Sequence, residues 1–582
     1  MKSLIQYVRQ AGVLIVSLLF FSYLLINTTA CEKTVEKVVE VHDTTFVNII
    51  SVDDVNATPD SIAVGGTITL TADVSLNGAA GDLIYDWKAS AGKFDSATGD
   101  TVTWHAPDET GSYTITVHVS DGANIGIGSR LVGVGMYAPT VTPYYVSREE
   151  CAGCHGKASG SSYDIDEAWS LTNHAGAWET LQSSGHAASY CFGCHSVGYE
   201  GENGNSGYDE APIAKFENVQ CENCHGPGSD HLASQDKADI DKNYDASVCG
   251  TCHDGGYHPF YTEWAASVHG NSLDNHAAGS AYCQGCHEGV AASIRLAGDM
   301  STFYGSGAIT DRPDTSEIAL SAISCAVCHS PHQADNEHQL RTISDIQLVD
   351  AGGVTPSPIT EGGNGKLCMQ CHHARRSADT QLENGYAYFG PHGSPQADML
   401  AAQSAYLGVA DASFNWAAPS HLYIENSCVT CHMNTIPYNG TTAVTGHSYE
   451  PTVEACGKCH GTINDFADIM ARDDFDGDGT VEGVQTEVTG LITLLETALV
   501  SAGLDTTGGV SIAHALGDTL RSTLQLRKAG YDLAFVLDDK SLGVHNPDYT
   551  VQILQQSYKF LTGAIPRGAV EADGLQKVAT IW

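Results

Sequence analysis

A single pattern, Cys-x-x-Cys-His, recurs nine times in this chain of 582 residues and uses 18 of its 19 cysteines. The copies lie at Cys151/Cys154/His155, Cys191/Cys194/His195, Cys221/Cys224/His225, Cys249/Cys252/His253, Cys283/Cys286/His287, Cys325/Cys328/His329, Cys368/Cys371/His372, Cys428/Cys431/His432 and Cys456/Cys459/His460. Two thiols followed by an imidazole form the attachment site of a c-type haem, whose iron the histidine binds. Zinc sites, redox dithiols and disulfide frameworks do not require the fixed histidine. The repeat therefore predicts nine covalently bound haem c groups.

The remaining histidines bear on the second ligand of each iron. A haem with two histidine ligands transfers electrons, whereas an open position or a lysine ligand allows a substrate to bind. Of the 26 histidines, nine belong to the motifs and 14 others lie within or after the motif region, and no motif ends in lysine. This surplus favours bis-histidine haems and electron transfer over catalysis.

The N-terminus has the layout of an export signal. Lys2 and Arg9 flank the start of an apolar run, which is followed by small residues and then Cys31, the only cysteine outside the motifs. The run is short for a membrane span. We expect residues 1–30 to be a signal peptide and Cys31 to carry a lipid, although Thr28 stands where a bacterial lipobox usually has leucine. Export agrees with c-type haem attachment, which bacteria perform outside the cytoplasmic membrane.

The formal net charge of −42 limits the class of partner. Phosphate binding needs a basic surface, so nucleic acid is excluded as a partner. A redox protein that docks through a basic patch fits this charge, although acidity also simply keeps an exported protein soluble.

Before the motifs, the chain reads as a stalk and a small β-domain. Residues 31–47 are polar, and residues 48–137 contain no cysteine. Apolar and polar side chains alternate over 67–76 and 113–119, which predicts half-buried strands separated by glycine-rich turns. We expect a β-sandwich, and the sequence resembles the immunoglobulin-like or polycystic-kidney-disease-type modules of exported bacterial proteins. His118 falls on the polar face of its strand, which predicts a solvated histidine.

The rest of the chain divides at about residue 460. Residues 138–460 hold nine motifs in too little chain for nine separate cores, so the haems are expected to contact one another. Helices there should be short, with loops around porphyrin. Residues 461–582 contain no cysteine and show helical apolar spacing over 483–503, 513–537 and 545–561, with Asn546 as a cap and Pro547 in the first turn. This predicts a helical region packed on the haems.

Several motif contexts carry a family resemblance. The strings "CAGCH", "EAWSLTNHAGAWETL", "VQCENCHGPGSDH" and "HPFYTEWAASVHGNS", within residues 148–272, resemble the cytochrome c-554 type of tetrahaem module. Later strings, such as "SCAVCHSPH", "PHGSPQADML" and "TGHSYEPTVEACGKCHG", are similar to larger multihaem cytochromes, including hydroxylamine oxidoreductases and nitrite reductases. The resemblance implies stacked haem pairs that form a continuous wire.

The same resemblance implies distal ligands. It assigns this role to His174, His231, His269, His332, His392, His421, His447 and His545, and it leaves the ninth ligand open among His258, His186 and His276. The chain departs from the nitrite reductases because it has no Cys-x-x-Cys-Lys motif. It carries 25 tyrosines, so an equivalent of the crosslinked tyrosine of the hydroxylamine oxidoreductases is not excluded.

One segment has the spacing of a calcium loop. Asp474, Asp476 and Asp478 precede Gly479 as at the start of an EF-hand loop, and Glu482 offers another oxygen. Position twelve of the loop is Gln485 rather than glutamate, and Glu487 follows two residues later. The pattern favours calcium over a plain acidic turn.

Together these patterns predict an exported nonahaem electron carrier, held at a membrane or cell surface by a lipid anchor. Its partners would be redox proteins or extracellular electron acceptors. The first alternative is an enzyme acting on nitrogen or sulfur compounds at one open haem. The second is a subunit of an oligomer that grows into a conductive filament.

Overall fold

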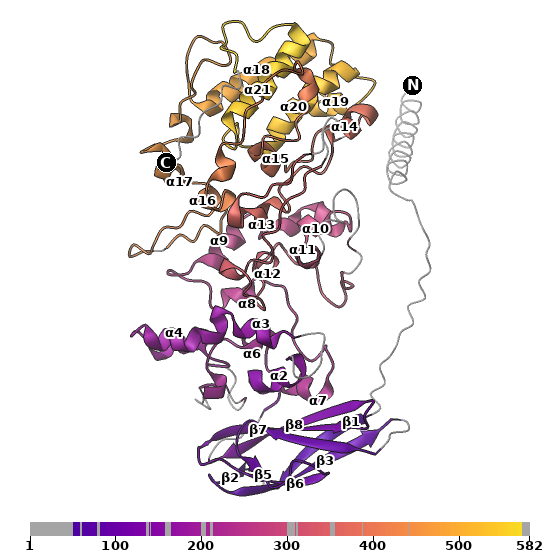
Figure 1. Cartoon of the computed structure of the whole chain (residues 1–582), viewed down its shortest axis with the longest axis vertical. Helices are drawn as coiled ribbons and strands as arrows, with labels where there is room; N and C mark the ends of the chain where they lie inside the picture. The colour runs from indigo at the N-terminus through magenta and orange to yellow at the C-terminus, as the bar shows by residue number, and fades with distance from the viewer. Residues whose placement is uncertain are drawn as a thin grey trace, which may run out of the picture.

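The computed structural model describes residues 50–572, except for 59–60, 78–81, 136–138, 140, 157–163, 200–204, 206, 210–213, 299–308, 310–311, 350–355, 387 and 442. The expected signal peptide, the stalk and Cys31 lie outside these residues. The described chain is elongated (Figure 1): strands form one end, the last helices form the other, and the motif region lies between them.

Two four-stranded sheets make up the N-terminal part. The strands are β1 (Ile50–Thr58), β2 (Ser61–Ile62), β3 (Thr67–Leu76), β4 (Ile84–Ala89), β5 (Lys93–Phe94), β6 (Thr101–His105), β7 (Gly111–Ser120) and β8 (Ile125–Val134). One sheet has the order β1-β3-β6-β5 and the other the order β2-β8-β7-β4. All neighbours pair antiparallel except β2 and β8, which pair parallel. The two sheets enclose one core that includes Ile68, Leu70, Trp87, Trp104 and Ile115.

The predicted alternation is confirmed in the first half of β3, where Ile68 and Leu70 are buried between exposed threonines, but not at its end, where Leu76 is 45% exposed. Each buried tryptophan donates its indole N–H to a backbone carbonyl, from Trp87 to Gly99 at 2.8 Å and from Trp104 to Ala91 at 3.0 Å. Close contact between sheets requires Gly128 in β8, since a Cβ there would lie 2.3 Å from Val52. The two indole hydrogen bonds and the close approach at Gly128 therefore fix how the sheets pack.

The polar face of β7 differs from expectation. Thr114 and Thr116 are 1% and 7% exposed, and His118 is half-buried rather than solvated. Thr116 Oγ1 donates to the carboxylate of Glu150, which lies in the first motif helix. Burial lowers the pKa of His118. The motif region covers part of the polar face of β7, and alternation alone does not show what covers the polar side of a strand.

A buried carboxylate joins the two parts. Glu222 is 3% exposed and accepts backbone N–H groups from Val146, Ser147 and Gly228. Burial raises the pKa of Glu222 to about 7. The bonds from Val146 and Ser147 hold the segment that follows the sheets against the third motif, and the bond from Gly228 fixes Glu222 to the chain after that motif.

Helices in the motif region are short, as the sequence predicts; the longest has nine residues. They are α2 (Arg148–His155), α3 (Asp166–Ser170), α4 (Ala177–Ser183), α5 (Phe192–His195), α6 (Cys221–His225), α7 (Ser229–Ser234), α8 (Ser247–Gly250), α9 (Phe260–Ala266), α10 (Gln284–His287), α11 (Gly289–Ala297), α12 (Cys325–Cys328), α13 (Lys366–Met369), α14 (Ala378–Asn384), α15 (Gln396–Leu400), α16 (Cys428–His432) and α17 (Val453–His460). Side-chain cores in this region are small, such as that around Ile346 and Met369.

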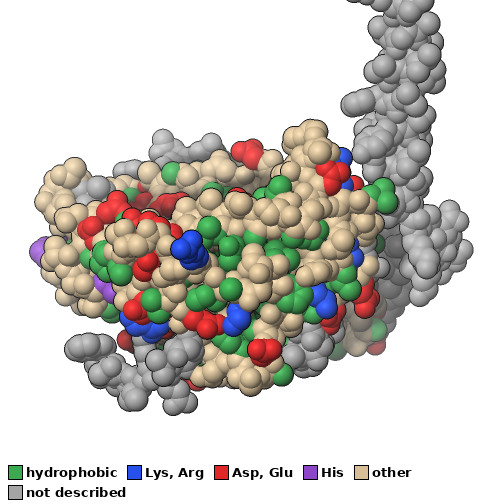
Figure 2. All heavy atoms as spheres, turned by 90° about the horizontal axis from the view of Figure 1, so that it is seen from above, with side chains coloured by type: hydrophobic (Ala, Val, Ile, Leu, Met, Phe, Trp, Pro, Cys, Tyr) green, Lys and Arg blue, Asp and Glu red, His purple; other side chains and the backbone are tan. Residues whose placement is uncertain are grey.

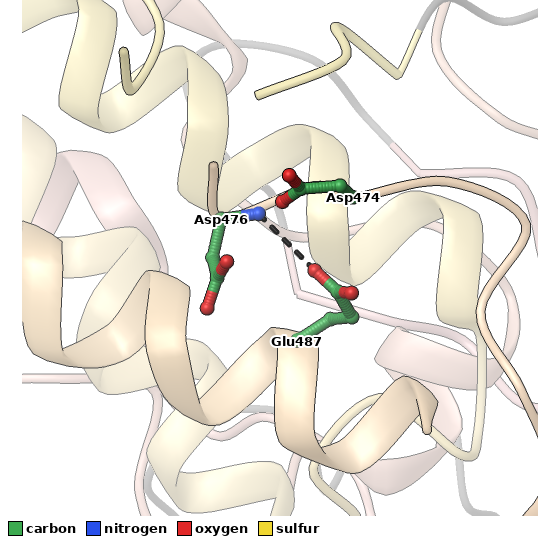
Figure 3. Close-up of side chains that lie close together, drawn as sticks. All are labelled: Asp474, Asp476 and Glu487. Carbon is green, nitrogen blue, oxygen red and sulfur yellow. Dashed lines mark hydrogen bonds between the residues drawn. The ribbon is translucent and has the colours of Figure 1, made fainter. Parts of the chain in front are cut away.

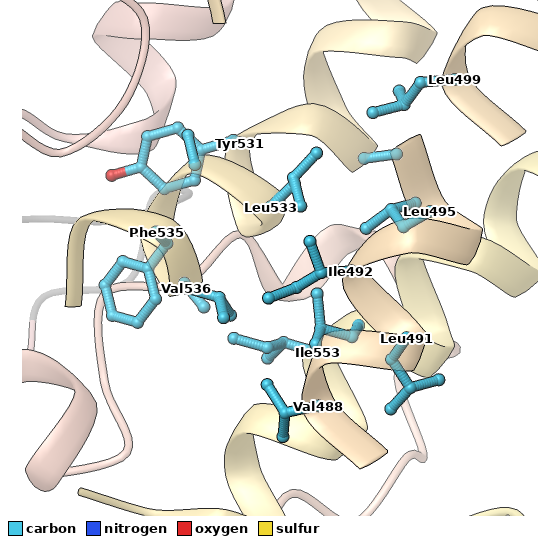
Figure 4. Packing of buried hydrophobic residues seen from close by; sticks show 14 of the residues in the cluster. Val488, Leu491, Ile492, Leu495, Leu499, Tyr531, Leu533, Phe535, Val536 and Ile553 are labelled. Atoms are coloured by element: carbon cyan, nitrogen blue, oxygen red, sulfur yellow. The ribbon is translucent and has the colours of Figure 1, made fainter. Parts of the chain in front are cut away.

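The C-terminal part is a helical unit with the largest apolar core. Its helices are α18 (Val484–Ser501), α19 (Ile512–Gly517), α20 (Leu524–Asp539) and α21 (Pro547–Thr562). Leu491, Leu495, Phe535 and Ile553 pack between α18, α20 and α21 (Figure 4). The predicted cap is confirmed, since the Asn546 side chain accepts the Tyr549 N–H with Pro547 in the first turn. The apolar pattern over 513–537 forms two helices, and Thr523 caps the second.

Figure 2 shows the face at this helical end, where acidic and basic side chains both lie among apolar and uncharged ones. No helix among the described residues has the length and apolar character needed to cross a membrane.

Candidate functional site

The nine motifs sit on or beside single helical turns. Residues three and four apart share one face of a helix, so both thiols and the histidine of a motif project to the same side. In α6, for example, Cys221, Cys224 and His225 occupy one turn, capped by Gln220 and Asn223. This local arrangement is what two thioether bonds and one axial imidazole on a single porphyrin require.

One motif cysteine, Cys459, departs from the expected environment. Thiols that attach a porphyrin should lie in a covered site, and the other cysteines of the motifs are half-buried, whereas Cys459 is exposed. The physical reason is its position in the last motif: Ala455 is the only buried residue of α17, so little of the chain packs over this helix. Cys459 is therefore less covered than the other motif cysteines, and attachment of a haem there stays a prediction.

Seven motif histidines face a second histidine ring from elsewhere in the chain. The ring centroids are separated by 6.4 Å for His155–His231, 6.2 Å for His253–His174, 6.1 Å for His225–His332, 6.0 Å for His372–His269, 6.3 Å for His287–His392, 6.2 Å for His460–His421 and 6.3 Å for His432–His545.

The narrow range of these ring-centroid separations tests whether the residues fit a haem. Two imidazoles that bind one metal from opposite sides, each at a nitrogen–metal distance of about 2 Å, hold their ring centres about 6 Å apart. Imidazoles packed directly against each other would lie closer. The spacing therefore leaves room for one iron between each pair, and the residues fit bis-histidine haem.

Hydrogen bonds turn the second nitrogen of many of these rings away from the gap. The Nδ1–H groups donate to backbone carbonyls, from His225 to Asp241 at 2.5 Å, from His231 to Asp236 at 2.8 Å and from His421 to Val544 at 2.7 Å. Because a carbonyl only accepts, Nε2 is the nitrogen left to bind a metal. His545 uses a carboxylate instead: its Nδ1 lies 2.7 Å from Oδ1 of Asp539.

His447 lies near His329. Burial lowers the pKa of His447, and among its neighbours the charge of His329 acts most strongly in the same direction. The segment that carries His447 is held by Glu263, whose carboxylate accepts the N–H groups of Thr445 and His447 and the hydroxyl of Thr445. All eight histidines assigned from the resemblance thus lie opposite or near a motif histidine.

His195 is the exception. Among the described residues, no histidine ring is in contact with that of His195, whose Nδ1 donates to the Ala177 carbonyl at 2.7 Å. Among the described residues, none of the three candidates for a ninth ligand forms a ring contact with His195. His258 stacks near Phe260, His276 acts on the pKa of His287, and His186 is exposed.

Cysteines of different motifs also meet. Five pairs of thiols from different motifs lie close enough to shift each other's pKa strongly: Cys151 and Cys221, Cys194 and Cys252, Cys249 and Cys325, Cys286 and Cys371, and Cys368 and Cys428. Three further pairs interact electrostatically: Cys224 with Cys249, Cys328 with Cys371, and Cys431 with Cys456. Numbered in chain order, the motifs form the line one-three-four-six-seven-eight-nine, with motif two joined to four and motif five joined to seven.

Sequence reasoning missed the groups that hold the histidines in place. Glu263 and Asp539 were not singled out, nor was the Arg375–Arg376 pair that follows motif seven. An acidic residue beside a ligand becomes visible only when segments distant in sequence are brought together, as Glu263 and His447 are. The paired arginines were a usable signal, because basic residues are scarce in this chain.

The acidic loop differs in part from the predicted calcium site. Asp474 and Asp476 lie close to Glu487 of α18, and their carboxylate oxygens are within 4.8 Å of one another (Figure 3). Glu487 accepts the N–H groups of Phe475, Asp476 and Glu482. Asp478 and Glu482 are not part of this group of three. Calcium binding stays a prediction.

Thiol pairs with adjacent histidines, repeated along the chain and faced by second histidines, define a protein that binds several haems covalently. Two segments match family models: residues 150–226 match "Cytochrome c554 and c-prime", and residues 413–570 match "Cytochrome c552". The first match spans motifs one to three and the second spans motifs eight and nine. The chain is a multihaem c-type cytochrome.

Two solved structures are similar to this chain at low identity. The outer cell wall cytochrome OcwA is 19% identical over 72% of this chain and all of its own, with a TM-score of 0.45. An undecahaem cytochrome from the S-layer of Carboxydothermus ferrireducens is 17% identical over 74% of this chain and 71% of its own, with a TM-score of 0.43. A search of curated proteins found no match.

Proposed function

We propose that this chain is an exported nonahaem cytochrome that carries electrons along bis-histidine haems. The observation that carries the proposal is the set of seven histidine ring pairs at 6.0–6.4 Å, each formed by one motif histidine and one distant histidine. His447, which the resemblance implies as a distal ligand, would complete an eighth site. Iron with both axial positions filled exchanges electrons without binding substrate, so these sites support transfer rather than catalysis.

The contacts between motifs support a continuous path. Haem supplies one-electron chemistry when bound, and the chain's part is to place neighbouring haems edge to edge. Thiols of different motifs that interact, such as Cys151 with Cys221 and Cys368 with Cys428, indicate that successive attachment sites are neighbours. The path runs from motif one, beside the sheets, to motif nine, beside the C-terminal helices, with side branches at motifs two and five.

A mass and spin-state census tests the proposal. The intact mass of the mature protein should correspond to nine covalent haems, and electron paramagnetic resonance of the ferric protein should show at least eight low-spin sites. His332→Ala should convert one low-spin site to high-spin, whereas His514→Ala, an exposed histidine of α19, should leave the count unchanged. Fewer covalent haems, or a majority of high-spin sites in the native protein, would contradict the proposal.

The His195 site favours a second function for one haem. No described histidine lies opposite this ring, so its iron would keep an open position for a small ligand. This is the arrangement that a reductase of nitrogen or sulfur compounds needs. The ferric protein should then show one high-spin signal that cyanide converts to low-spin, and this signal should persist in His514→Ala. A native protein that is low-spin throughout would exclude this function.

We also propose that the N-terminal sheets form an immunoglobulin-like sandwich. The sheet β1-β3-β6-β5 corresponds to strands A-B-E-D of that fold, and the sheet β2-β8-β7-β4 corresponds to A-G-F-C, with β1 and β2 as the two parts of a divided strand A. Trp87 on the third long strand is buried, and the Tyr113 hydroxyl donates to the Glu109 carbonyl at 3.1 Å, as in a tyrosine corner. Such a module would act as a spacer between a lipid on Cys31 and the haems. Labelling with a radioactive fatty acid, lost in Cys31→Ser, tests the anchor.

A further inference from the structure

A tight turn precedes the ninth motif and ends at Tyr449. The backbone φ of Tyr449 is 62°, in the left-handed region that residues with bulky side chains rarely adopt. The Tyr449 N–H donates to the Gly446 carbonyl at 3.1 Å, and a Cβ on Gly446 would lie only 2.5 Å from Cα of Met433. The turn therefore packs closely against the residue that follows His432. A strained conformation persists only where the surrounding structure holds it, so the directions of the Tyr449 ring and carbonyl are fixed.

The Tyr449 ring contacts two histidines that the resemblance implies as distal ligands. Its centroid lies 4.6 Å from that of His269, and the two planes differ by 77°, which is an edge-on contact. The same ring lies 6.1 Å from His447. The His269 ring in turn faces His372 of motif seven, with centroids 6.0 Å apart. The Tyr449 side chain is therefore in contact with the motif-seven pair.

The His269 ring is held by packing rather than by a hydrogen bond. Within the part of the chain that the structure describes, neither ring nitrogen of His269 has a hydrogen-bond partner, whereas Nδ1 of His225 and of His421 donates to a backbone carbonyl. An imidazole that binds a metal through one nitrogen can still rotate about that bond, and a hydrogen bond from its second nitrogen usually prevents this rotation. For His269, the edge-on contact with Tyr449 is the aromatic contact that can set the plane of the ring.

The Tyr449 carbonyl serves the neighbouring site. It accepts the Nδ1–H of His432 at 2.9 Å, which leaves Nε2 of this motif-eight histidine to bind a metal. The two motifs adjoin, because a Cβ on Gly365, three residues before Cys368, would lie 3.0 Å from the amide nitrogen of Cys428. One residue therefore contacts a histidine of each of two adjacent motif sites, with its ring at one and its backbone at the other.

We propose that Tyr449 is a positioning residue for the haem sites of motifs seven and eight: its ring sets the plane of His269, and its carbonyl sets that of His432. The proposal rests on the proposed function, because it assigns both histidines to iron. The orientation of the axial rings affects the electronic structure of low-spin iron, and groups that contact the ligands control that orientation. Tyr449 would thus tune two neighbouring steps of the electron path.

Electron paramagnetic resonance of the ferric holoprotein tests the role of the ring. His269→Ala identifies the large-g signal of the motif-seven site by removing it. We expect Tyr449→Leu to shift the maximum g value of that signal by more than its linewidth, with the number of low-spin haems unchanged, because the His269 ring loses its edge-on contact. Tyr449→Phe keeps the ring and should retain the wild-type signal. Tyr85→Leu, at a half-buried tyrosine of β4, is the control and should also match wild type.

A change in the turn tests the role of the carbonyl. Gly446→Ala introduces a Cβ that has no space, at a residue with a φ of 77°, so the turn and the Tyr449 carbonyl must move. We expect this variant to shift the signal of the His432 site, which is identified by its loss in His545→Ala. Tyr449→Leu keeps the carbonyl and should leave that signal in place. Gly440→Ala is the matched control and should match wild type, since Gly440 also has a positive φ but a Cβ there would meet no atom within 4 Å.

Three outcomes overturn the proposal. An unchanged motif-seven signal in Tyr449→Leu would show that the ring does not set the plane of His269. An equal shift in Tyr449→Leu and Tyr449→Phe would assign the effect to the hydroxyl rather than to the ring. An unchanged His432 signal in Gly446→Ala would show that the carbonyl does not orient that histidine.

Incomplete haem loading of a variant does not remove the test. Tyr449→Met replaces Tyr449→Leu if the latter loads fewer haems, since it also lacks the ring. Thr445→Val replaces Gly446→Ala, because it loosens the same turn by removing the hydroxyl that donates to Glu263. Failure of the proposed function would appear differently: His269→Ala would leave the number of low-spin haems unchanged.

Discussion

The imidazole rings of His225 and His332 lie 6.1 Å apart between centroids, and their planes differ by only 12°. The rings of His421 and His460 have almost the same separation, 6.2 Å, but their planes differ by 76°. Equal separation with different ring angles is what two histidines would show if each pair bound one iron in the proposed way and each ring were oriented by its own hydrogen bonds. The pairs therefore divide into near-parallel, intermediate and near-perpendicular classes.

This division predicts the paramagnetic spectrum. Near-parallel axial imidazoles split the iron d-orbitals strongly and give rhombic low-spin signals, whereas near-perpendicular ones give signals with a large maximum g value. We expect rhombic signals from His225–His332 and His155–His231, and large-g signals from pairs such as His269–His372, whose planes differ by 76°. His332→Ala should remove a rhombic signal, and His421→Ala should remove a large-g signal. Loss of the same signal in both variants would contradict the assignment.

Glu263 is expected to position His447. Its carboxylate accepts three hydrogen bonds from Thr445 and His447, so Glu263→Ala would leave these donors without partners at a cost of about 1–3 kcal/mol. The loop that carries His447 should then loosen, and resonance Raman spectra should show a fraction of five-coordinate high-spin haem. Glu263→Gln, which keeps one accepting oxygen, should retain more low-spin haem than Glu263→Ala. Exposed Glu167 provides the control as Glu167→Ala. Identical spectra for both Glu263 variants and wild type would exclude a positioning role.

The histidines that face one another could be predicted from the sequence, but their pairing could not. The motif marks each first ligand, and the resemblance supplied eight further histidines that the structure brings opposite or near motif histidines. Which ring faces which depends on how separate segments cross. His174 lies near motifs one and two in the chain yet faces His253 of motif four. Local spacing carries no information about such crossings, since short helices and loops fix them through tertiary contacts.

The fold shows the same division between local and tertiary signals. Alternation predicted β3, and apolar spacing with the Asn546 cap predicted α21, because both depend on neighbouring residues. The burial of Thr114 and Thr116 was missed, since it depends on Glu150 and the helix that packs over β7. The branch at motif five likewise arises only when distant segments meet.

Asp532 should make stability depend on pH. This carboxyl is fully buried in α20, accepts the Tyr406 N–H at 2.7 Å and lies 2.9 Å from the Ser557 hydroxyl. Burial holds the pKa of Asp532 well above its usual value. The folded state therefore keeps its proton at pH values where the unfolded chain, with a pKa of about 4, has lost it. Stability is greatest below the unfolded pKa and falls as pH rises through the folded pKa.

Asp532→Asn removes this titration while keeping an acceptor for Tyr406 and a donor for Ser557. We expect the variant to gain about 1.4 kcal/mol at neutral pH for each unit by which the pKa of Asp532 is raised. Urea unfolding between pH 4 and pH 8 should show a flatter profile for Asp532→Asn than for wild type, and exposed Asp411→Asn should follow wild type. Parallel profiles for wild type and Asp532→Asn would show that Asp532 ionises normally in the folded protein.

The C-terminal helices should stabilise the haem site of motif eight. Leu495 is fully buried between α18, α20 and α21 (Figure 4), so Leu495→Ala should cost about 2–5 kcal/mol through lost burial and the cavity that remains. Leu520 is 94% exposed, and Leu520→Ala should change stability by less than about 0.5 kcal/mol.

The coupling arises because α21 begins directly after His545, which faces His432 with ring centroids 6.3 Å apart. Unfolding of the helical unit should therefore release one histidine ligand. In thermal scans of Leu495→Ala, far-ultraviolet circular dichroism and the high-spin absorption band should change together, both at a lower temperature than in Leu520→Ala. The circular dichroism transition could instead shift to a lower temperature without any change in the high-spin band. That result would show that His545 stays in place when the helices unfold, so the haem site of motif eight would not depend on the C-terminal helices.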